Sequence, residues 1–319
     1  MKVLITGGAG FIGSHLAEAF LKLGDEVFVI DNLWTGSLSN IIHLKNHSNF
    51  HCVIDTILNE DIMDSLIKEA DQLFHLAAAV GVKTIMEHPV DTLEANVKGT
   101  EIVLRIANKY KKKVFIASSS EVYGKHMEHT LSETDNRVMG DVKKRRWAYA
   151  CSKAIGEFMA LAYFEEKKLP VVIGRLFNTV GPRQTGQYGM VVPRFVRSAL
   201  LGKPITVYGD GTQTRSFIHV HDVVNAIIRL MQESSAEGDI FNIGNGKEIS
   251  IKELAYKVKQ MTNSASEIEF IPYEKVYGPG FEDMQRRCPN IEKLKKIINF
   301  KPTYDIDMII QSVIDYFKQ

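Results

Sequence analysis

The sequence predicts an α/β fold in which a doubly wound parallel sheet is joined to a smaller C-terminal α/β lobe. The first observation is that short apolar runs, typical of buried parallel strands, alternate with segments of helical apolar spacing up to the region of Leu176. The second is length, because 319 residues with 45% hydrophobic content exceed one doubly wound unit and can fill a large core. We therefore expect one lobe over residues 1–178 and a second over residues 179–319.

The chain opens with a glycine-rich turn between a strand and a helix. Residues 3–5 are an apolar run, and residues 14–21 have the apolar spacing of a helix. Between them lie three glycines: Gly7, Gly10 and Gly13. Glycine permits a tight turn and a close approach of backbone amides to a pyrophosphate at the positive end of the helix. This order predicts a Rossmann-type dinucleotide site.

The second predicted strand indicates which dinucleotide binds. It covers residues 26–30 and is followed by Asp31. An acidic residue at this place can accept hydrogen bonds from both hydroxyls of an adenosine ribose, and it repels a 2′-phosphate. We therefore expect NAD as the cofactor rather than NADP.

Later segments are expected to complete the sheet and to build the second lobe. The apolar run at residues 114–117 predicts a strand that carries the polar residues 118–124 to the carboxyl edge of the sheet, where ligands bind. Residues 239–243 predict a late strand that returns to the main sheet. Three helices are expected in the second lobe: Pro193–Leu201, Val220–Gln232 and Ile251–Met261.

Composition and charge argue against several classes of protein. The formal net charge of +1 gives no electrostatic reason to expect nucleic acid or a membrane as a partner. No apolar run reaches membrane-spanning length, and the apolar start is too short for a signal peptide. The three cysteines are too scattered for a disulfide framework or a zinc site, so we expect a cytoplasmic protein without a metal. The basic cluster at residues 143–146 is expected to be solvated, and the alternative is that it borders the mouth of a site, because Trp147 and Tyr149 follow it.

Tyr149 and Lys153 are candidates for acid–base chemistry. Residues at this spacing share one face of a helix, so the spacing alone is also compatible with an ordinary helix face. A tyrosine phenol titrates at about 10, but an adjacent ammonium and a cationic nicotinamide would both favour the phenolate. The pair therefore predicts a proton carrier in Tyr149, with the ammonium supplied by Lys153.

Many short motifs, taken in order along the chain, resemble one known family. They are the glycine turn, Asp31, His75–Ala78, Asn96, Ser118–Gly124, Tyr149 with Lys153, Arg175–Asn178, Gly181–Arg183, Val191–Pro193 and Gly209–Val220. Through them nearly the whole chain resembles the extended short-chain dehydrogenase/reductase family, specifically its nucleotide-sugar epimerases, dehydratases and decarboxylases. The resemblance implies bound NAD, a nucleotide-sugar substrate, and a homodimer paired through the helices near residues 92–110 and 150–165.

The resemblance also implies roles for individual residues. The catalytic set is expected to be Ser119, Ser120, Glu121, Tyr149 and Lys153. The cofactor is expected to contact Gly7, Gly10, Phe11, Ile12, Gly13, Asp31, Asn32, Asp55, Thr56, Leu76, Ala77, Ala78, Asn96, Tyr149 and Lys153. The substrate is expected to contact Asn178, Val191, Val192, Arg215 and Arg287.

One ketone intermediate serves three reactions. After oxidation of the sugar at C4, the hydride can return on the other face, a C6 carboxylate can leave as carbon dioxide, or a C6 hydroxyl can be eliminated. Many family dehydratases place an acid after the catalytic hydroxyl, whereas this chain has Ser120, a much weaker proton donor, which disfavours dehydration. Dehydration stays open, because the GDP-mannose dehydratases resemble this chain in having a serine and a glutamate after the hydroxyl. We therefore expect 4-epimerisation of a UDP-sugar, with UDP-glucuronate among the candidates. The alternatives are UDP-glucuronate decarboxylation and then NDP-sugar 4,6-dehydration.

Further expectations concern the sugar's charged end and the noncatalytic alternative. Glu121 and Arg287 also resemble the decarboxylases, and with a uronate Arg287 is expected to bind the carboxylate and hold it against loss. A noncatalytic NAD-binding regulator is the hypothesis from another class, although it needs neither Tyr149 nor Lys153. The histidines, His75 among them, lack paired ligand spacing and are expected to be structural.

Overall fold

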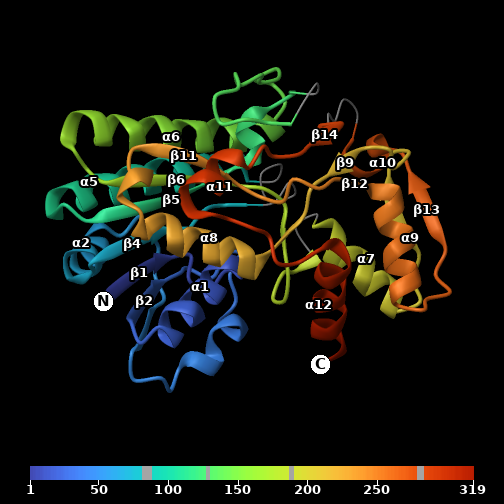
Figure 1. Ribbon diagram of the computed structural model, residues 1–319, viewed down its shortest axis with the longest axis horizontal. Coiled ribbons are helices and arrows are strands. Elements are labelled where there is room, and N and C mark those ends of the chain that lie inside the picture. The colour runs from blue at the N-terminus through green and yellow to red at the C-terminus, as the bar shows by residue number, and fades with distance from the viewer. Residues whose placement is uncertain (81–87, 127–129, 187–189, 279–283) are drawn as a thin grey trace.

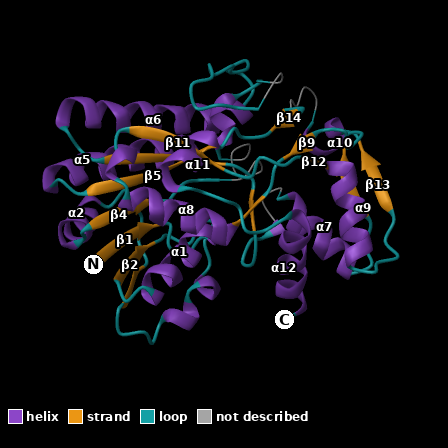
Figure 2. Cartoon of the chain, viewed as in Figure 1, coloured by secondary structure: helices purple, strands orange, loops and turns teal. Residues whose placement is uncertain are grey.

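The computed structural model describes residues 1–80, 88–126, 130–186, 190–278 and 284–319. At its centre is a seven-stranded sheet in the order β11-β6-β5-β4-β1-β2-β3, and every neighbouring pair is parallel (Figures 1 and 2). These strands are β1 (Lys2–Thr6), β2 (Glu26–Ile30), β3 (Phe50–Val53), β4 (Gln72–His75), β5 (Lys113–Ser119), β6 (Val171–Leu176) and β11 (Asp239–Ile243). The expected doubly wound sheet is confirmed.

Helices cover both faces of this sheet (Figure 1). One face packs on α1 (Phe11–Lys22), α8 (Val220–Gln232) and α11 (Glu292–Ile298). The other packs on α2 (Glu60–Glu69), α5 (Gly99–Tyr110) and α6 (Arg146–Lys167). The first core includes Leu16 and Val223 and the second includes Ile102 and Ala160, all fully buried. Because both faces are covered, the strands are mostly apolar, as the sequence suggested.

The turn between β1 and α1 requires glycine at two places. Gly7 has a φ of 73°, and a Cβ there would lie 2.8 Å from the backbone nitrogen of Ala77. A Cβ at Gly13 would lie 2.2 Å from the carbonyl oxygen of Gly7. These close approaches let α1 begin directly above the end of β1, which leaves the amides of its first turn facing the ligand side of the sheet.

The second lobe has a core of its own, which includes Phe195, Leu254 and Ile310. Its main helices are α7 (Val191–Leu200), α9 (Ile251–Met261) and α12 (Ile306–Lys318). Its smaller elements are β7 (Thr179–Val180), β8 (Ile205–Tyr208), β9 (Thr214–Arg215), β10 (Ile218–His219), β12 (Ile249–Ser250), β13 (Ile268–Ile271), α10 (Tyr273–Tyr277) and β14 (Arg286–Arg287). None of the described helices is both long and apolar enough to cross a membrane.

Parts of the second half of the chain build the first lobe. Strand β11 pairs with β6 at the edge of the main sheet, as expected for residues 239–243. Helices α8 and α9 have the expected bounds. Helix α7 begins at Val191, two residues before the expected start at Pro193, because a proline is tolerated within the first turn of a helix.

Candidate active site

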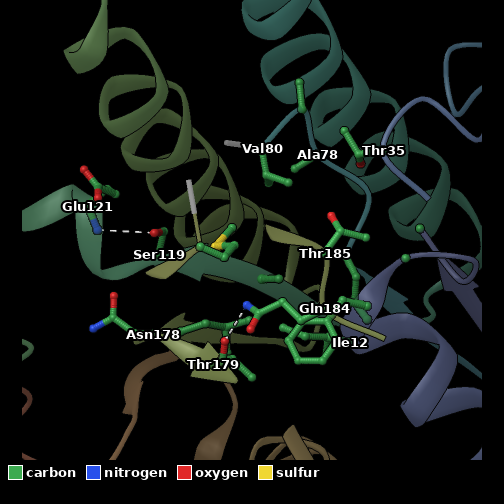
Figure 3. A pocket seen from close by; sticks show the side chains of 18 of the residues that line it. Ile12, Thr35, Ala78, Val80, Ser119, Glu121, Asn178, Thr179, Gln184 and Thr185 are labelled. Atoms are coloured by element: carbon green, nitrogen blue, oxygen red, sulfur yellow. Dashed lines mark hydrogen bonds between the residues drawn. The ribbon is translucent and has the colours of Figure 1, made fainter. Parts of the chain in front are cut away.

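A cavity of about 520 Å³ lies at the carboxyl ends of β1, β4, β5 and β6 and extends into the second lobe. This size is typical of small-molecule sites. The predicted residues that line it are Gly7, Gly10, Phe11, Ile12, Gly13, Asp31, Asn32, Thr56, Leu76, Ala77, Ala78, Ser119, Ser120, Glu121, Tyr149, Lys153, Asn178, Val191, Val192, Arg215 and Arg287. In Figure 3, Ser119 and Glu121 lie toward one end of the view and Ile12 and Thr185 toward the other.

Asp31 is held at the end of β2 by backbone amides. Its carboxylate accepts hydrogen bonds from the amides of Ala9 at 3.0 Å and Leu33 at 2.8 Å. Burial raises the pKa of this carboxyl, and the backbone hydrogen bonds partly oppose the rise. A Cβ at Gly36 would lie 2.9 Å from both carboxylate oxygens, so glycine leaves the approach open. This arrangement fits the hydroxyls of an adenosine ribose.

Two residues expected to contact the cofactor, Asp55 and Asn96, are not among the residues that line the cavity, so their contact with the cofactor stays a prediction. Asn96 is 2% exposed, accepts from the amide of Ala79 at 2.9 Å and donates to the hydroxyl of Ser152 at 3.1 Å. Asp55 accepts from the amide of Thr56 at 2.6 Å. Both side chains position backbone that borders the cavity, so they act on the site through their neighbours.

Several lining residues next to Asp31 were missed by the sequence reasoning. They are Trp34, Thr35, Ser37 and Asn40. Asn40 donates to the carbonyl of Ala9 at 2.9 Å and so ties this loop to the glycine turn. Their position directly after a predicted ribose-binding acid was the available signal.

Ser119, Tyr149 and Lys153 come together at the end of β5, as expected. Burial raises the pKa of the Tyr149 phenol to about 12, and a hydrogen bond with the Ser119 side chain opposes that rise. Burial also lowers the pKa of the Lys153 amine to about 8. The three groups form an acid–base set in which Lys153 is buried and Ser119 and Tyr149 are half-buried, and its protonation states depend on the neighbouring charges.

The neighbours of Tyr149 and Lys153 differ in kind. The Lys153 ammonium donates to the backbone carbonyl of Ala117 at 2.8 Å. The charged side chains that act on the pKa of Tyr149 are Glu121, which raises it, and Arg287, which lowers it. The role expected for Lys153 in favouring the phenolate stays a prediction.

Glu121 is clamped between two arginines. One carboxylate oxygen contacts the guanidinium of Arg287, and the other lies 3.4 Å from the guanidinium of Arg146. Arg287 also lies 3.5 Å from the hydroxyl of Ser120, which is 2% exposed. The expected solvation of the basic cluster is therefore wrong for Arg146, which is 9% exposed and faces the cavity, because its ion pair with Glu121 offsets the cost of burial.

A second buried ion pair lies beneath the acid–base set. Glu157 accepts two hydrogen bonds of 2.8 Å each from Arg175 and one of 2.5 Å from the hydroxyl of Ser118. Burial alone would raise the pKa of Glu157, but these partners together with Arg137 lower it. Sequence reasoning placed Arg175 in a family motif but missed Glu157, although it stands one helical turn after Lys153.

The end of the cavity where the substrate is expected to bind lies in the second lobe. Asn178 is fixed by a 2.8 Å hydrogen bond to the carbonyl of Ser216, and Arg215 lies on β9 beside β14. Three residues of this end were missed: Tyr208, Gln213 and Tyr273. The amide of Gln213 donates to the carbonyl of Tyr208 at 2.9 Å and to the hydroxyl of Tyr273 at 2.8 Å. This polar and aromatic wall is suited to a nucleobase.

His75 has the structural role expected for it. Its two ring nitrogens lie 2.8 Å from the hydroxyl of Thr6 and 3.1 Å from that of Thr100. Burial lowers the pKa of this imidazole to about 3. Within the described ranges, no group of three or more His, Cys, Asp or Glu residues is arranged to hold a metal ion.

Comparison with known proteins identifies the family. The model described as GDP-mannose 4,6 dehydratase matches residues 4–313. The chain belongs to this family. It is accordingly an extended short-chain dehydrogenase/reductase, as the motifs indicated.

The relatives of this family member differ in the reaction they catalyse. A UDP-N-acetyl-alpha-D-glucosaminuronate decarboxylase of Bacillus cytotoxicus is 44% identical over 100% of this chain and 98% of that protein. UDP-glucuronic acid decarboxylase 1 of Xenopus tropicalis is 36% identical over 100% of this chain and 72% of that protein. The structure of a Bacillus cereus UDP-glucuronic acid 4-epimerase with UDP-glucuronic acid and NAD is 29% identical, with a TM-score of 0.90 over 100% of this chain and 99% of that chain.

Proposed function

We propose that the protein decarboxylates a UDP-linked uronic acid and uses NAD as a bound cofactor. The observation that carries the proposal is the set of charges at the sugar end of the cavity. Ser120 stands where many family dehydratases place an acid, and Glu121 is shared by Arg146 and Arg287. Two guanidinium groups and one carboxylate leave a single net positive charge, which suits a sugar carboxylate better than a neutral C6 hydroxyl.

The residues of the cavity divide the work around C4. The glycine turn and Asp31 would hold NAD, which would supply the acceptor and later the donor of a hydride at C4. Tyr149 takes the proton of the C4 hydroxyl, and Ser119 shares that hydrogen bond. The C4 ketone turns a C6 carboxylate into a β-keto acid. The C5–C6 bond then breaks, its electron pair moves toward C5 and the C4 oxygen, carbon dioxide leaves, and C5 takes up one proton from water.

The pairing of Arg287 changes the expected fate of the carboxylate. A guanidinium reserved for the substrate would stabilise the carboxylate and hold it against loss. Here Arg287 already contacts Glu121, so a bound uronate must share that guanidinium with a second carboxylate. Loss of carbon dioxide, which is neutral, removes one of the two competing anions. The geometry thus favours decarboxylation, the first alternative from the sequence, over the epimerisation expected there.

The relatives support the same choice of reaction and of nucleotide. Both relatives named above are decarboxylases of UDP-linked uronates by their names, and they span this whole chain. We therefore propose UDP-glucuronate and UDP-N-acetylglucosaminuronate as the candidate substrates. Tyr208 and Tyr273 are suited to the uracil end of such molecules.

A second candidate is C4 epimerisation of the same uronates. The Bacillus cereus structure with UDP-glucuronic acid and NAD supports it, since its fold aligns over this entire chain. Both reactions pass through the same ketone. They differ in whether the C6 carboxylate leaves before the hydride returns.

Turnover in heavy water separates these reactions. The protein is incubated with NAD and, in separate samples, with UDP-glucuronate, UDP-N-acetylglucosaminuronate, UDP-glucose and GDP-mannose, and the products are read by mass spectrometry and NMR. Decarboxylation gives a UDP-pentose with one deuterium at C5, because the carbanion carbon takes its proton from solvent. Epimerisation gives unchanged mass and no deuterium at C5. A 4-keto-6-deoxy sugar from either hexose would overturn the role given to Ser120.

We also propose a homodimer and a cytoplasmic location. Helix α6 carries the exposed apolar side chains Ile155 and Phe158, which suit a helix pair between two copies. All three cysteines are free thiols, which suits a reducing compartment.

A further inference from the structure

We propose that Arg146 is a positioning residue that keeps hold of Glu121 when a substrate carboxylate engages Arg287. The proposal rests on the proposed function, because it concerns how the same site receives a uronate. Arg146 lies in the first turn of α6 and contacts the carboxylate oxygen of Glu121 that Arg287 does not use. Each oxygen of Glu121 therefore has a guanidinium of its own.

The two arginines come from different lobes. Arg146 belongs to α6, which packs on the main sheet, and its guanidinium lies 5.2 Å from the ring centroid of Trp147, a side chain that is 2% exposed. Arg287 belongs to β14, which pairs in parallel with β9 in the second lobe. Residue Arg215 on β9 also lines the substrate end of the cavity. Arg146 is thus fixed with the catalytic helix, whereas Arg287 is part of the substrate lobe.

The number of charges explains why the second arginine is needed. A uronate brings a second carboxylate into a site where Glu121 is 19% exposed and Arg287 is 12% exposed at the side chain. With Arg287 alone, two carboxylates would compete for one guanidinium, and a buried unpaired charge is strongly unfavourable. Arg146 contacts the other oxygen of Glu121 and so holds Glu121 in place. Arg287 can then meet the substrate carboxylate while Glu121 still competes for its guanidinium.

Arg146 also couples this charge to the acid–base residue. It stands three residues before Tyr149 on α6, so the two side chains lie on neighbouring turns of one face. The charge of Glu121 acts on Tyr149. If Glu121 followed Arg287 toward the substrate, its distance from the phenol would change. Arg146 prevents that movement by holding Glu121 against the helix that carries Tyr149.

A double-mutant cycle tests the proposal on the full-length protein with NAD. The variants are Arg146→Met, Glu121→Gln and their combination, and kcat and KM are measured with the uronate that the parent turns over. We expect Arg146→Met alone to lower kcat by about 10- to 100-fold with a smaller change in KM. When Arg146→Met is added to Glu121→Gln, kcat should fall by less than about 2-fold further. The effects of two substitutions are not additive when one residue acts through the other. Arg146→Lys should restore part of kcat.

Controls separate positioning from a general loss of structure. Arg145→Met changes the exposed neighbouring arginine and should leave kcat within about 2-fold of the parent. NAD affinity and the melting temperature should stay close to parental values in Arg146→Met, whereas a merely structural role would lower both. If Arg146→Met does not fold, Arg146→Lys takes its place in the cycle.

The outcomes distinguish this inference from the proposed function. Failure of the parent to release carbon dioxide from either uronate overturns the proposed function, and the cycle is then measured on C4 epimerisation of the same uronates. Independent, multiplicative losses for Arg146→Met and Glu121→Gln overturn the role of Arg146, whatever the product. The role of Arg146 is also overturned if kcat falls in Arg146→Met only to the extent that NAD affinity falls.

Discussion

At the residue scale, Asp31 should select the cofactor. Replacing it with alanine removes the acceptor for the ribose hydroxyls and the charge that repels a 2′-phosphate. Because hydrogen bonds to a charged group contribute about 1.5–3 kcal/mol, Asp31→Ala should weaken NAD binding by roughly 10- to 100-fold and reduce the preference over NADP. Titration calorimetry with both cofactors measures this. Equal affinities for NAD and NADP in the parent would contradict the assignment.

Tyr149 should carry the proton at C4. The change Tyr149→Phe removes the phenolic hydroxyl with little change in volume, so turnover should fall by about 10²- to 10⁴-fold, the usual contribution of general acid–base catalysis. NAD binding should remain measurable. Tyr163→Phe, on the same helix but outside the cavity lining, is the matched control and should keep near-parental turnover. Near-parental turnover in Tyr149→Phe would assign the proton to another group.

The sequence could reveal a functional residue when its role follows from the residues next to it in the chain. Asp31 and Tyr149 follow from patterns within a strand or a helix, and both line the cavity. Arg146 stands in a run of basic residues that resembles a solvated surface, and only its contact with Glu121, 25 residues away, shows otherwise. A motif gives a residue's neighbourhood without the direction of its side chain, so it could place Asn96 near the cavity but not decide whether it lines it.

At the scale of elements, α6 organises the catalytic residues. Four of its functional side chains follow one another at spacings of three or four residues: Arg146, Tyr149, Lys153 and Glu157. Because an α-helix has 3.6 residues per turn, these spacings place them along one face. Glu157 fastens that face to β6 through Arg175. This buried pair therefore helps to hold the face of α6 that carries Tyr149 and Lys153.

Removing the charge of Glu157 should test that anchor. Glu157→Gln leaves the guanidinium of Arg175 without its carboxylate in a site that is 1% exposed, and breaking a buried pair of this kind costs about 3–5 kcal/mol. The free energy of unfolding from urea titration should fall by that order. Glu166→Gln, near the exposed end of the same helix, should change it by less than about 0.5 kcal/mol. A parental free energy of unfolding in Glu157→Gln would show that α6 is held by its apolar contacts.

The ends of a helix were predictable where its apolar spacing continues over several turns. Helices α8 and α9 show apolar spacing over three turns or more, and their bounds match the expectation. The pairs β7–β10 and β12–β9–β14 involve strands of two residues each, too short for any period to be read. Arg287 lies in one of them, so its place beside Glu121 depended on a tertiary pairing that the local sequence does not encode.

At the scale of the whole molecule, an apolar surface should join two copies. Its exposed side chains are Val90, Leu93, Ile155 and Phe158. We expect the parent to sediment as a dimer and Phe158→Glu to sediment as a monomer, because taking a charge out of water into an apolar interface is unfavourable. Phe270→Glu, an exposed phenylalanine on β13, is the control and should remain dimeric. A monomeric parent at micromolar concentration would contradict the proposed homodimer.

Three histidines link α1 to the second lobe. The ring of His15 donates to the carbonyl of Pro182 at 3.0 Å and lies 5.2 Å from the ring of His221, which lies 4.8 Å from that of His219. His219 stacks on Tyr304 at 3.8 Å. Burial lowers the pKa of His15 to about 4 and that of His219 to about 3. The folded protein therefore keeps both rings neutral at pH values where an unfolded histidine takes up a proton.

This difference should make the junction of the lobes sensitive to acid. Unfolded histidine has a pKa of about 6.5, so stability is complete above that pH and falls as the pH drops toward about 4, by up to about 1.4 kcal/mol per pH unit for each buried ring. Urea unfolding at about pH 7.5 and about pH 5 measures the loss. His15→Gln keeps a donor for the Pro182 carbonyl but cannot titrate, so it should lose less stability between these pH values than the parent or the exposed control His47→Gln. His15→Gln cannot take up the proton that is proposed to cause the loss of stability. If its free energy of unfolding fell between these pH values as much as that of the parent, groups other than His15 would govern the acid sensitivity.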